Sequence, residues 1–239
     1  MNFTTTTTHQ SKYDASTGLS AGYMSVQGGC LVGNDLYSFM VYVDNSYCNI
    51  IKTDMTTGAS TTVATGLDLG HANDAAFNGT DIIVTDCGAN DGTVKTLYVI
   101  ELENYTVKQT ITLDETVVSI AYDEINERYV TIGYQNDYIN IYDKDFNLIK
   151  RFVGVITDGY AAQGILTDGT YLYMLEYYSE KNNLCIFDLA TGERVKVIDI
   201  GIAREAENIV YKNGDFFVTC NNDNWTGREV YQISVNEAS

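Results

Sequence analysis

The chain has 239 residues, of which 32 are acidic and 14 are basic, so that its formal net charge at neutral pH is −18. This negative field excludes nucleic acid as a partner, because affinity for nucleic acid rests mainly on Lys and Arg side chains that neutralise phosphates. No apolar run approaches the roughly 18 residues of a membrane span, and the first ten residues lack the basic and apolar regions of a secretion signal. We therefore expect no membrane insertion, and a cytoplasmic or virion-associated protein that is secreted if a leader has been removed.

The first predicted element is a strand at about residues 2–9, where five consecutive threonines follow Phe3. Threonine is β-branched and favours strands. The alternative for this tract is a disordered leader. A polar linker at 11–22 separates it from the next predicted strand.

From residue 26 onward the sequence repeats with a period of about 45 residues. Each repeat begins with a short strand, a tight turn on Gly or Asn, and a second strand rich in β-branched and aromatic residues. The five hairpins are VQGGCLVGNDLYSF (26–39), ANDAAFNGTDIIVT (72–85), VSIAYDEINERYVT (118–131), AQGILTDGTYLYML (162–175) and ENIVYKNGDFFVTC (207–220).

A polar loop and a third strand follow each hairpin. These third strands are YCNIIKTD (47–54), KTLYVIEL (95–102), YINIYD (138–143), NLCIFDL (183–189) and EVYQISV (229–235). A fourth strand then follows, as in TVKQTITL (106–113). Four antiparallel strands at this period are typical of propeller blades. Lipocalin-type barrels lack such a four-strand period, and a parallel β-helix has a shorter repeat.

The fifth repeat ends after its third strand, with only NEAS remaining. An open ring would leave strand edges exposed, and the threonine strand at 2–9 is available to complete the last blade. The predicted fold is an all-β, five-bladed β-propeller in a single domain, 1–239, closed by its N-terminal strand. The predicted blades span about 22–67, 68–114, 115–157, 158–202 and 203–235.

Aligning the repeats on the hairpin turn places one polar residue of each first strand in a column. Its members are Gln27, Asn73, Ser119, Gln163 and Asn208, at spacings of 46, 46, 44 and 45 residues. In a propeller the first strands line the central channel, so the column predicts a ring of uncharged hydrogen-bonding groups. These side chains either satisfy backbone groups and water around the channel or bind a polar ligand or ion.

Next to this column, His71 precedes Asn73 and Asp74, and Glu207 precedes Asn208. A histidine with carboxylates on one channel face is what a general acid–base pair needs. Asp74 and Glu207 with amide oxygens would also suit Ca²⁺ or another hard divalent cation. The alternative for His71 is a local hydrogen bond at a turn. We expect His71, Glu207 and Asp74 to be the catalytic residues if the protein is an enzyme.

The single tryptophan, Trp225, lies beside Asn224 in the loop between the second and third strands of the last blade. An exposed indole among amides suits a sugar ring, which stacks on aromatic faces while amides bind its hydroxyls. The alternative is an indole that packs as a cover over the blade. The corresponding loops of the other blades are also rich in Asn and Asp, which are common turn formers.

Five cysteines lie far apart in the chain: Cys30, Cys48, Cys87, Cys185 and Cys220. They form no C-x-x-C pair. An odd, scattered set predicts buried free thiols, and no disulfide framework or zinc site.

The second strands of G-x-x-LY type and the turns TDMTTG and FDLATG resemble propeller-repeat proteins with NHL- or YVTN-type blades. A narrower similarity is to the propeller-type glutaminyl cyclotransferases, which are five-bladed. It rests on Gln27-Gly28 with Leu36-Tyr37, on Gln163-Gly164 with Leu172-Tyr173, and on the acidic stretch 205–208. Gluconolactonase-like propellers, which have six blades, hold a channel metal with Glu, Asn and Asp. These resemblances imply a channel-site enzyme, either a cyclotransferase or a metal-dependent hydrolase or lactonase.

The leading functional hypothesis is a non-catalytic module that recognises a carbohydrate or a protein surface through one propeller face. Its binding residues would be Trp225, Asn224, Gln27, Asn73, Gln163 and Asn208. The first alternative is the channel-site enzyme. The second is a structural component of a larger assembly such as a phage particle or tail, suggested by a composition rich in Thr, Asn, Tyr and Gly.

Overall fold

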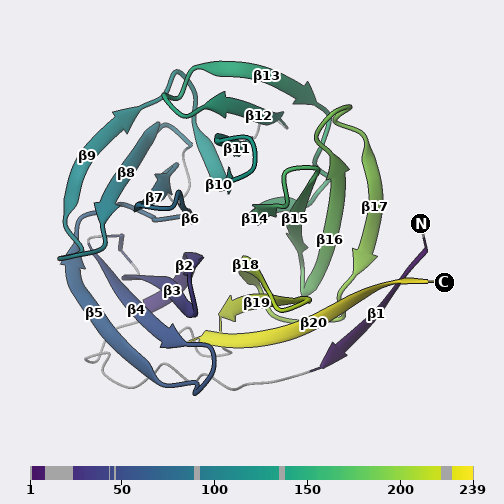
Figure 1. Ribbon diagram of the computed structural model, residues 1–239, viewed down its shortest axis with the longest axis horizontal. Coiled ribbons are helices and arrows are strands. Elements are labelled where there is room, and N and C mark those ends of the chain that lie inside the picture. Colours follow the sequence, from purple (N-terminus) through teal and green to yellow (C-terminus); the bar gives the residue numbers. More distant parts are fainter. Residues whose placement is uncertain are drawn as a thin grey trace.

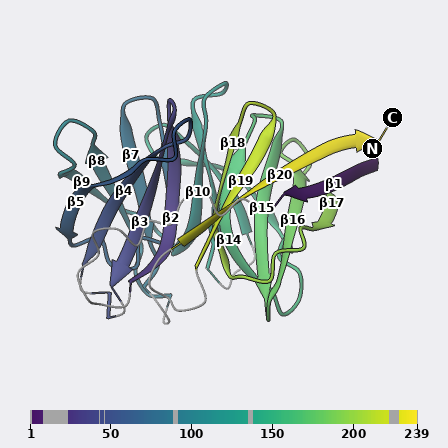
Figure 2. The same ribbon diagram turned by 90° about the horizontal axis from the view of Figure 1, so that it is seen from below.

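The computed structural model describes residues 2–8, 24–42, 44–45, 47–88, 92–134, 138–221 and 228–238. They form five antiparallel four-stranded sheets arranged around a central axis (Figure 1). Figure 2 shows the same ring of sheets from the side. The fold is the predicted five-bladed β-propeller. Among the residues that the structure describes, no helix is long and apolar enough to cross a membrane.

In blades 1 to 4 the strands follow one another in chain order from the axis outward. Blade 1 contains β2 (Met24–Val32), β3 (Asp35–Tyr42), β4 (Cys48–Asp54) and β5 (Ser60–Leu67). Blade 2 contains β6 (Asp74–Phe77), β7 (Asp81–Asp86), β8 (Thr96–Glu101) and β9 (Val107–Thr112). Blade 3 contains β10 (Val117–Asp123), β11 (Arg128–Gly133), β12 (Tyr138–Asp143) and β13 (Leu148–Val153). Blade 4 contains β14 (Ala161–Thr167), β15 (Tyr171–Tyr178), β16 (Lys181–Asp188) and β17 (Arg194–Asp199).

Blade 5 joins the two ends of the chain. It contains β18 (Ala206–Lys212), β19 (Asp215–Asn221), β20 (Arg228–Ala238) and, as its outermost strand, β1 (Asn2–Thr8). β1 pairs with β20 in antiparallel register from Asn2 opposite Ala238 to Thr8 opposite Gln232. Figure 1 shows the two strands side by side at the rim of the ring. The N-terminal strand therefore closes the propeller as the sequence predicts.

Burial follows the position of a strand within its blade. All six residues of the second strand β7 are buried, whereas the fourth strand β9 is almost wholly exposed. The inner strands are covered on both faces because neighbouring blades pack against them. Removing their β-branched and aromatic side chains from water provides the main stabilisation of the fold.

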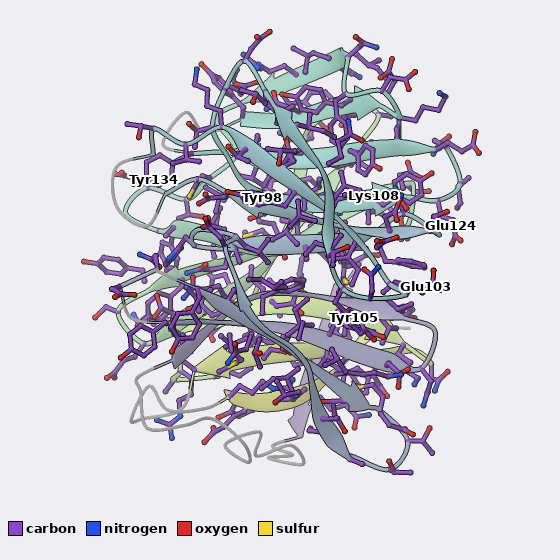
Figure 3. All side chains as sticks on the ribbon, turned by 90° about the vertical axis from the view of Figure 1, so that its left-hand side faces the viewer. Tyr98, Glu103, Tyr105, Lys108, Glu124 and Tyr134 are labelled. Atoms are coloured by element: carbon purple, nitrogen blue, oxygen red, sulfur yellow. The ribbon has the colours of Figure 1, made fainter. Side chains whose placement is uncertain are left out.

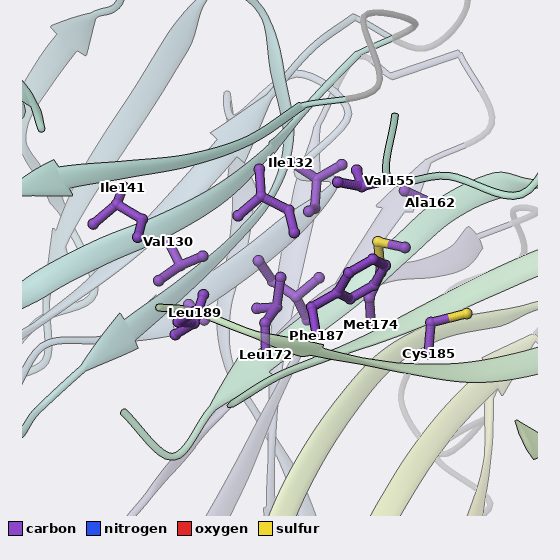
Figure 4. Packing of buried hydrophobic residues seen from close by; sticks show 13 residues of the cluster. Val130, Ile132, Ile141, Val155, Ala162, Leu172, Met174, Cys185, Phe187 and Leu189 are labelled. Atoms are coloured by element: carbon purple, nitrogen blue, oxygen red, sulfur yellow. The ribbon is translucent and has the colours of Figure 1, made fainter. Parts of the chain in front are cut away.

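The packing between blades 3 and 4 shows how this core is built (Figure 4). Side chains of the two facing sheets interdigitate: Val130, Ile132 and Ile141 from blade 3, and Leu172, Met174, Cys185 and Phe187 from blade 4. All five cysteines are buried and free, which confirms the prediction made from their spacing. Their thiols therefore act as small apolar groups in these cores.

Candidate functional site

One residue from each innermost segment meets its neighbours on the axis and closes the channel. We call this set the closing layer: Gly28, Asp74, Ser119, Gly164 and Asn208. Two of its members are glycines because the strands approach too closely for a side chain. A Cβ on Gly28 would lie 2.5 Å from Asp74 Cα, and one on Gly164 would lie 2.7 Å from Asn208 Cα.

Asp74 is the centre of the closing layer, and its side chain is completely buried. Its Oδ2 accepts hydrogen bonds from the backbone N–H of Ile120 at 3.1 Å and of Ile165 at 3.3 Å. Its Oδ1 accepts from the N–H of Ala75 at 2.9 Å and from Asn208 Nδ2 at 3.4 Å. One carboxyl group therefore connects blades 2, 3, 4 and 5.

The remaining blades are joined in the same layer. Asn208 Nδ2 donates to the carbonyl of Gly29 at 2.7 Å, and the N–H of Gly28 donates to the carbonyl of Ala72 at 3.0 Å. Ser119 Oγ donates to the carbonyl of Gln163. Blade 1 is thus bonded to blades 5 and 2, and the ring of contacts around the axis is complete.

The closing layer separates two cavities at opposite ends of the channel. The cavity of about 620 Å³ on the Glu207 side, which we call the polar pocket, is lined mainly by amide, carboxyl, imidazole and phenol groups. The cavity of about 630 Å³ at the other end, which we call the apolar pocket, is lined mainly by aliphatic and aromatic side chains. In Figure 3, Tyr134 of the polar pocket and Glu124 of the apolar pocket lie at opposite ends of the molecule.

Each innermost segment contributes the residue just before the closing layer to the polar pocket. These residues are Gln27, Asn73, Val118, Gln163 and Glu207. The column read from the sequence is thus displaced by one residue in blades 3 and 5. Ser119 and Asn208 lie in the closing layer, and Val118 and Glu207 take the ring positions.

Glu207 is the buried carboxyl group of this ring, and one of its two carboxyl oxygens is held by Asn221. Asn221 Nδ2 donates to Glu207 Oε1 at 2.8 Å, and Asn221 Oδ1 accepts from the N–H of Val26 at 2.8 Å. No described residue donates a hydrogen bond to Glu207 Oε2. Burial, followed by the negative charge of Glu205, raises the pKa of Glu207 well above its ordinary value, against the opposing effect of the Asn221 hydrogen bond. Burial also raises the pKa of Glu205, which lines the same pocket.

His71 lies in the turn that precedes β6 and also lines the polar pocket. Its Nδ1 donates to Asn45 Oδ1 at 2.7 Å, which leaves Nε2 as an acceptor. Burial lowers the pKa of His71, although the charge of Asp86 opposes the shift. The imidazole is therefore neutral at physiological pH, and the pocket contains a neutral histidine beside weakly acidic carboxyl groups.

Three amides of the ring retain hydrogen-bonding atoms that no described residue uses. Gln27 donates from Nε2 to Ser25 Oγ at 3.0 Å, which leaves its Oε1 without a partner. Asn73 accepts from the N–H of Cys87 at 3.0 Å through Oδ1, which leaves its Nδ2 without one. The side chain of Gln163 makes no hydrogen bond within the described part of the chain. The floor of the pocket therefore presents both donors and acceptors.

Tyrosines form the walls around this floor. Tyr42, Tyr134 and Tyr160 line the pocket, each close to the end of a strand on this face of the propeller. Tyr42 stacks on Tyr47 with ring centroids 4.9 Å apart, and Tyr160 packs on Tyr178 at 5.6 Å. The walls combine flat apolar faces with hydroxyl groups.

The predicted site residues divide among the polar pocket, the closing layer and a segment outside the described residues. His71, Asn73, Gln27, Gln163 and Glu207 come together in the polar pocket, whereas Asp74 and Asn208 lie in the closing layer beneath it. Trp225 and Asn224 lie outside the described residues. Sequence reasoning missed the three wall tyrosines, although Tyr42 ends a second strand, Tyr134 directly follows one, and Tyr160 directly precedes the first strand of blade 4.

The predicted cation site depends on whether Asp74 and Glu207 can share an ion. Within the described residues, no group of three or more His, Cys, Asp or Glu side chains is arranged to hold a metal ion. Asp74 already accepts hydrogen bonds at both oxygens, so the two carboxylates expected to share a cation, Asp74 and Glu207, are engaged in different layers.

No protein-family model and no curated protein matches the chain. Solved structures do match. By fold, the chain is similar to a bacterial glutaminyl cyclase. That enzyme, from Myxococcus xanthus, is 14% identical at a TM-score of 0.68, over 91% of this chain and 93% of the other.

Two further structures match over almost the whole chain. A luciferin-regenerating enzyme is 10% identical at a TM-score of 0.63, over 99% of this chain and 98% of the other. A chain of a nidogen/laminin complex is 15% identical at a TM-score of 0.57, over 98% of both chains. At these identities the similarity establishes the propeller fold alone, because one fold carries both enzymes and binding proteins.

Proposed function

We propose that the protein is a recognition module that binds a small carbohydrate in the polar pocket. The observation that carries the proposal is the ring of hydrogen-bonding atoms left unused at the pocket floor by Gln27, Asn73, Gln163, His71 and Glu207. A sugar presents several hydroxyls on a compact ring, and each hydroxyl both donates and accepts. The tyrosine walls provide apolar faces for the carbon side of that ring.

The size and charge of the site support the same class of ligand. A volume of about 620 Å³ falls within the range of roughly 300–1,000 Å³ that is usual for small-molecule sites. The net charge of −18 disfavours anionic ligands. The neutral imidazole and the raised pKa values of Glu205 and Glu207 favour a neutral ligand over a strongly charged one.

Binding of soluble mono- and oligosaccharides, measured by isothermal titration calorimetry, tests the proposal. Gln163→Ala should weaken the best ligand about three- to tenfold, which corresponds to one neutral hydrogen bond. The matched control is Gln109→Ala on the exposed outer strand β9, and it should leave the affinity unchanged. Absence of heat for every sugar at millimolar concentration, or equal weakening by the two variants, would contradict the proposal.

A second candidate function is acid–base catalysis at the same pocket, favoured by the raised pKa of Glu207 beside Glu205. A carboxyl group with a raised pKa is better suited to protonate a leaving group than an ordinary glutamate. The fold similarity to a glutaminyl cyclase makes peptides with an N-terminal glutamine the first substrates to test. Release of ammonia from such a peptide would support catalysis if the Glu207→Gln variant abolishes the release but still binds the peptide. Absence of turnover would contradict catalysis, and the recognition module would remain the proposed function.

A further inference from the structure

The apolar pocket lies at the opposite end of the axis from the proposed sugar site. Each innermost strand contributes the residue just beyond the closing layer, and all five of these residues are aliphatic or lack a side chain: Gly29, Ala75, Ile120, Ile165 and Ile209. Aromatic side chains surround them: Phe77, Tyr122, Tyr173, Tyr211 and Phe216. The closing layer forms its floor, and Glu124, Asp168 and Gly214, which lie in the turns between first and second strands, line its mouth.

The cavity continues outward between blades 4 and 5. Ile186 of β16 and Val235 of β20 line it, and both belong to third strands, away from the axis. Tyr173 and Phe216 connect this part to the channel mouth, with ring centroids 5.1 Å apart. The pocket is therefore elongated and suits an extended hydrocarbon body more than a compact polar one.

Every charged residue that lines the apolar pocket is acidic. Glu124 is exposed in the turn after β10 and makes no hydrogen bond or ion pair within the described part of the chain. Asp168 is exposed in the turn after β14, where Tyr173 Oη donates to its Oδ2 at 2.9 Å. The N–H groups of Thr170 and Tyr171 fix its other oxygen.

The nearby basic side chains are directed to other partners. Lys212 Nζ bonds to Asn34 Oδ1, across the gap between blades 5 and 1. Arg128 pairs with Asp123 at 2.7 Å and reaches the carbonyl of Gly169. Neither basic side chain lines the pocket, so neither one neutralises the negative charges of Glu124 and Asp168 at its mouth.

We propose that the apolar pocket binds an amphiphilic organic cation, with its hydrocarbon chain between blades 4 and 5 and its ammonium group at the mouth. The chain would bury its surface against Ile165, Ile186 and Phe216, which is favourable in proportion to the apolar area removed from water. The ammonium group would lie near Glu124 and Asp168. Tyr211, which is 51% exposed, offers a ring face for a cation–π contact at the mouth.

The same features exclude other classes of ligand. A fatty acid of equal length would place its carboxylate beside Glu124 and Asp168 in a protein of net charge −18. A sugar would lose hydrogen bonds against the aliphatic floor, and the hydroxyl of Thr167 beside that floor already donates to the carbonyl of Tyr171.

Titration of the full chain with decyltrimethylammonium, below its micelle-forming concentration, tests the proposal by calorimetry. Decanol, decyl sulfate and tetramethylammonium separate the contributions of the chain and the head. We expect the cation with a chain to bind most tightly, decanol more weakly, and the other two not measurably. Raising the salt concentration should weaken the cation and leave decanol unaffected, because salt screens the charge contribution. Equal affinity for decyl sulfate would overturn the proposal.

Variants with equal net charge locate the binding. Glu124→Gln with Asp168→Asn removes the acidic mouth, and Asn preserves the turn at 168. The matched control, Glu103→Gln with Asp145→Asn, removes the same charges from exposed sites outside the pocket; Glu103 lies at the same end of the molecule as Glu124 (Figure 3). We expect the first pair to weaken the cation about three- to tenfold and the control pair to leave it unchanged.

A third variant, Leu166→Trp, fills the pocket from a partly buried position on its wall. It should abolish binding of both the cation and decanol while thermal unfolding shows a folded protein. Full binding by this variant, or equal effects of the two charge pairs, would place the cation on the general acidic surface and overturn the proposal.

Discussion

Asp74 is an acidic residue whose side chain is completely buried at the axis of the propeller. Burial raises its pKa well above the ordinary value, although three backbone N–H groups and Asn208 oppose the shift. The carboxyl group is retained because the N–H groups of Ile120 and Ile165 converge on Oδ2 from two different blades. A buried donor without an acceptor costs about 1–3 kcal/mol, so the acid satisfies groups that no aliphatic side chain can.

The Asp74→Ala variant should therefore lose about 2–5 kcal/mol of unfolding free energy, because it leaves both N–H groups without their acceptor. Asp74→Asn keeps one acceptor oxygen in nearly the same volume and should lose about half as much. Urea denaturation followed by fluorescence or circular dichroism measures both variants. Equal stability of Ala and Asn would mean that the carboxyl oxygens do not hold the blades together.

Glu207 makes the stability of the protein depend on pH. Its pKa lies well above the ordinary 4.5 in the folded state, chiefly because of burial. At pH values between the pKa of Glu207 in the unfolded chain and its raised pKa in the folded state, the folded protein binds more protons than the unfolded chain. The free energy of unfolding therefore falls as the pH rises through this range. The Glu207→Gln variant has no proton to lose and still accepts the Asn221 hydrogen bond.

The melting temperature of Glu207→Gln relative to the natural protein should therefore increase as the pH is raised from 4 to 8. Differential scanning calorimetry of the two proteins at matched pH values measures this difference, in which the titration of all other groups largely cancels. A difference that stays constant, or decreases with pH, would contradict a raised pKa for Glu207.

At the scale of single elements, β1 closes the ring through its pairing with β20. Alternate N–H groups of an edge strand point to its neighbour, so one of any two consecutive residues donates to the ladder and the other does not. Proline removes that donor. Thr5→Pro and Thr6→Pro, at the centre of β1, should therefore differ: one should lower the melting temperature clearly more than the other. Thr5→Val and Thr6→Val keep the donors and are the matched controls. Equal, negligible effects of both prolines would show that β1 does not contribute to stability.

The blade hairpins could be predicted from the sequence, but the register of the channel ring could not be predicted fully. The alignment of the repeats rests on the turn glycines Gly33, Gly79, Gly169 and Gly214. In blade 1, Gly33 is the first residue of a two-residue turn, whereas in blade 5 Gly214 is the second, after Asn213 with a positive φ of 53°. Anchoring on glycine therefore shifts the strand by one residue. Blade 3 has a four-residue turn without glycine, which shifts it as well.

At the scale of the whole molecule, the five-bladed ring and its closure follow from the period of the sequence, because each hairpin needs a neighbouring hairpin to cover its apolar faces. The candidate site can be predicted from the sequence only in part. His71, Asn73 and Glu207 were recognised as neighbours of the channel, but the depth at which each side chain lies depends on the bulges of the inner strands. A one-residue difference separates Glu207, which lines the polar pocket, from Asn208, which lies in the closing layer.

The net charge of −18 should make the stability of the whole molecule depend on salt. Compact folding brings 32 acidic side chains together against 14 basic ones, and the resulting repulsion is screened within about 10 Å at 0.1 M salt. Raising NaCl from about 10 to 150 mM at pH 7.5 should therefore increase the melting temperature by about 2–5 °C, equivalent to about 1 kcal/mol in a chain of this size. Near pH 4.5, where protonation of carboxylates reduces the net charge, the same addition should have little effect. Potassium chloride should reproduce both results, since screening does not distinguish the two cations. An equal salt effect at the two pH values would contradict repulsion as the cause.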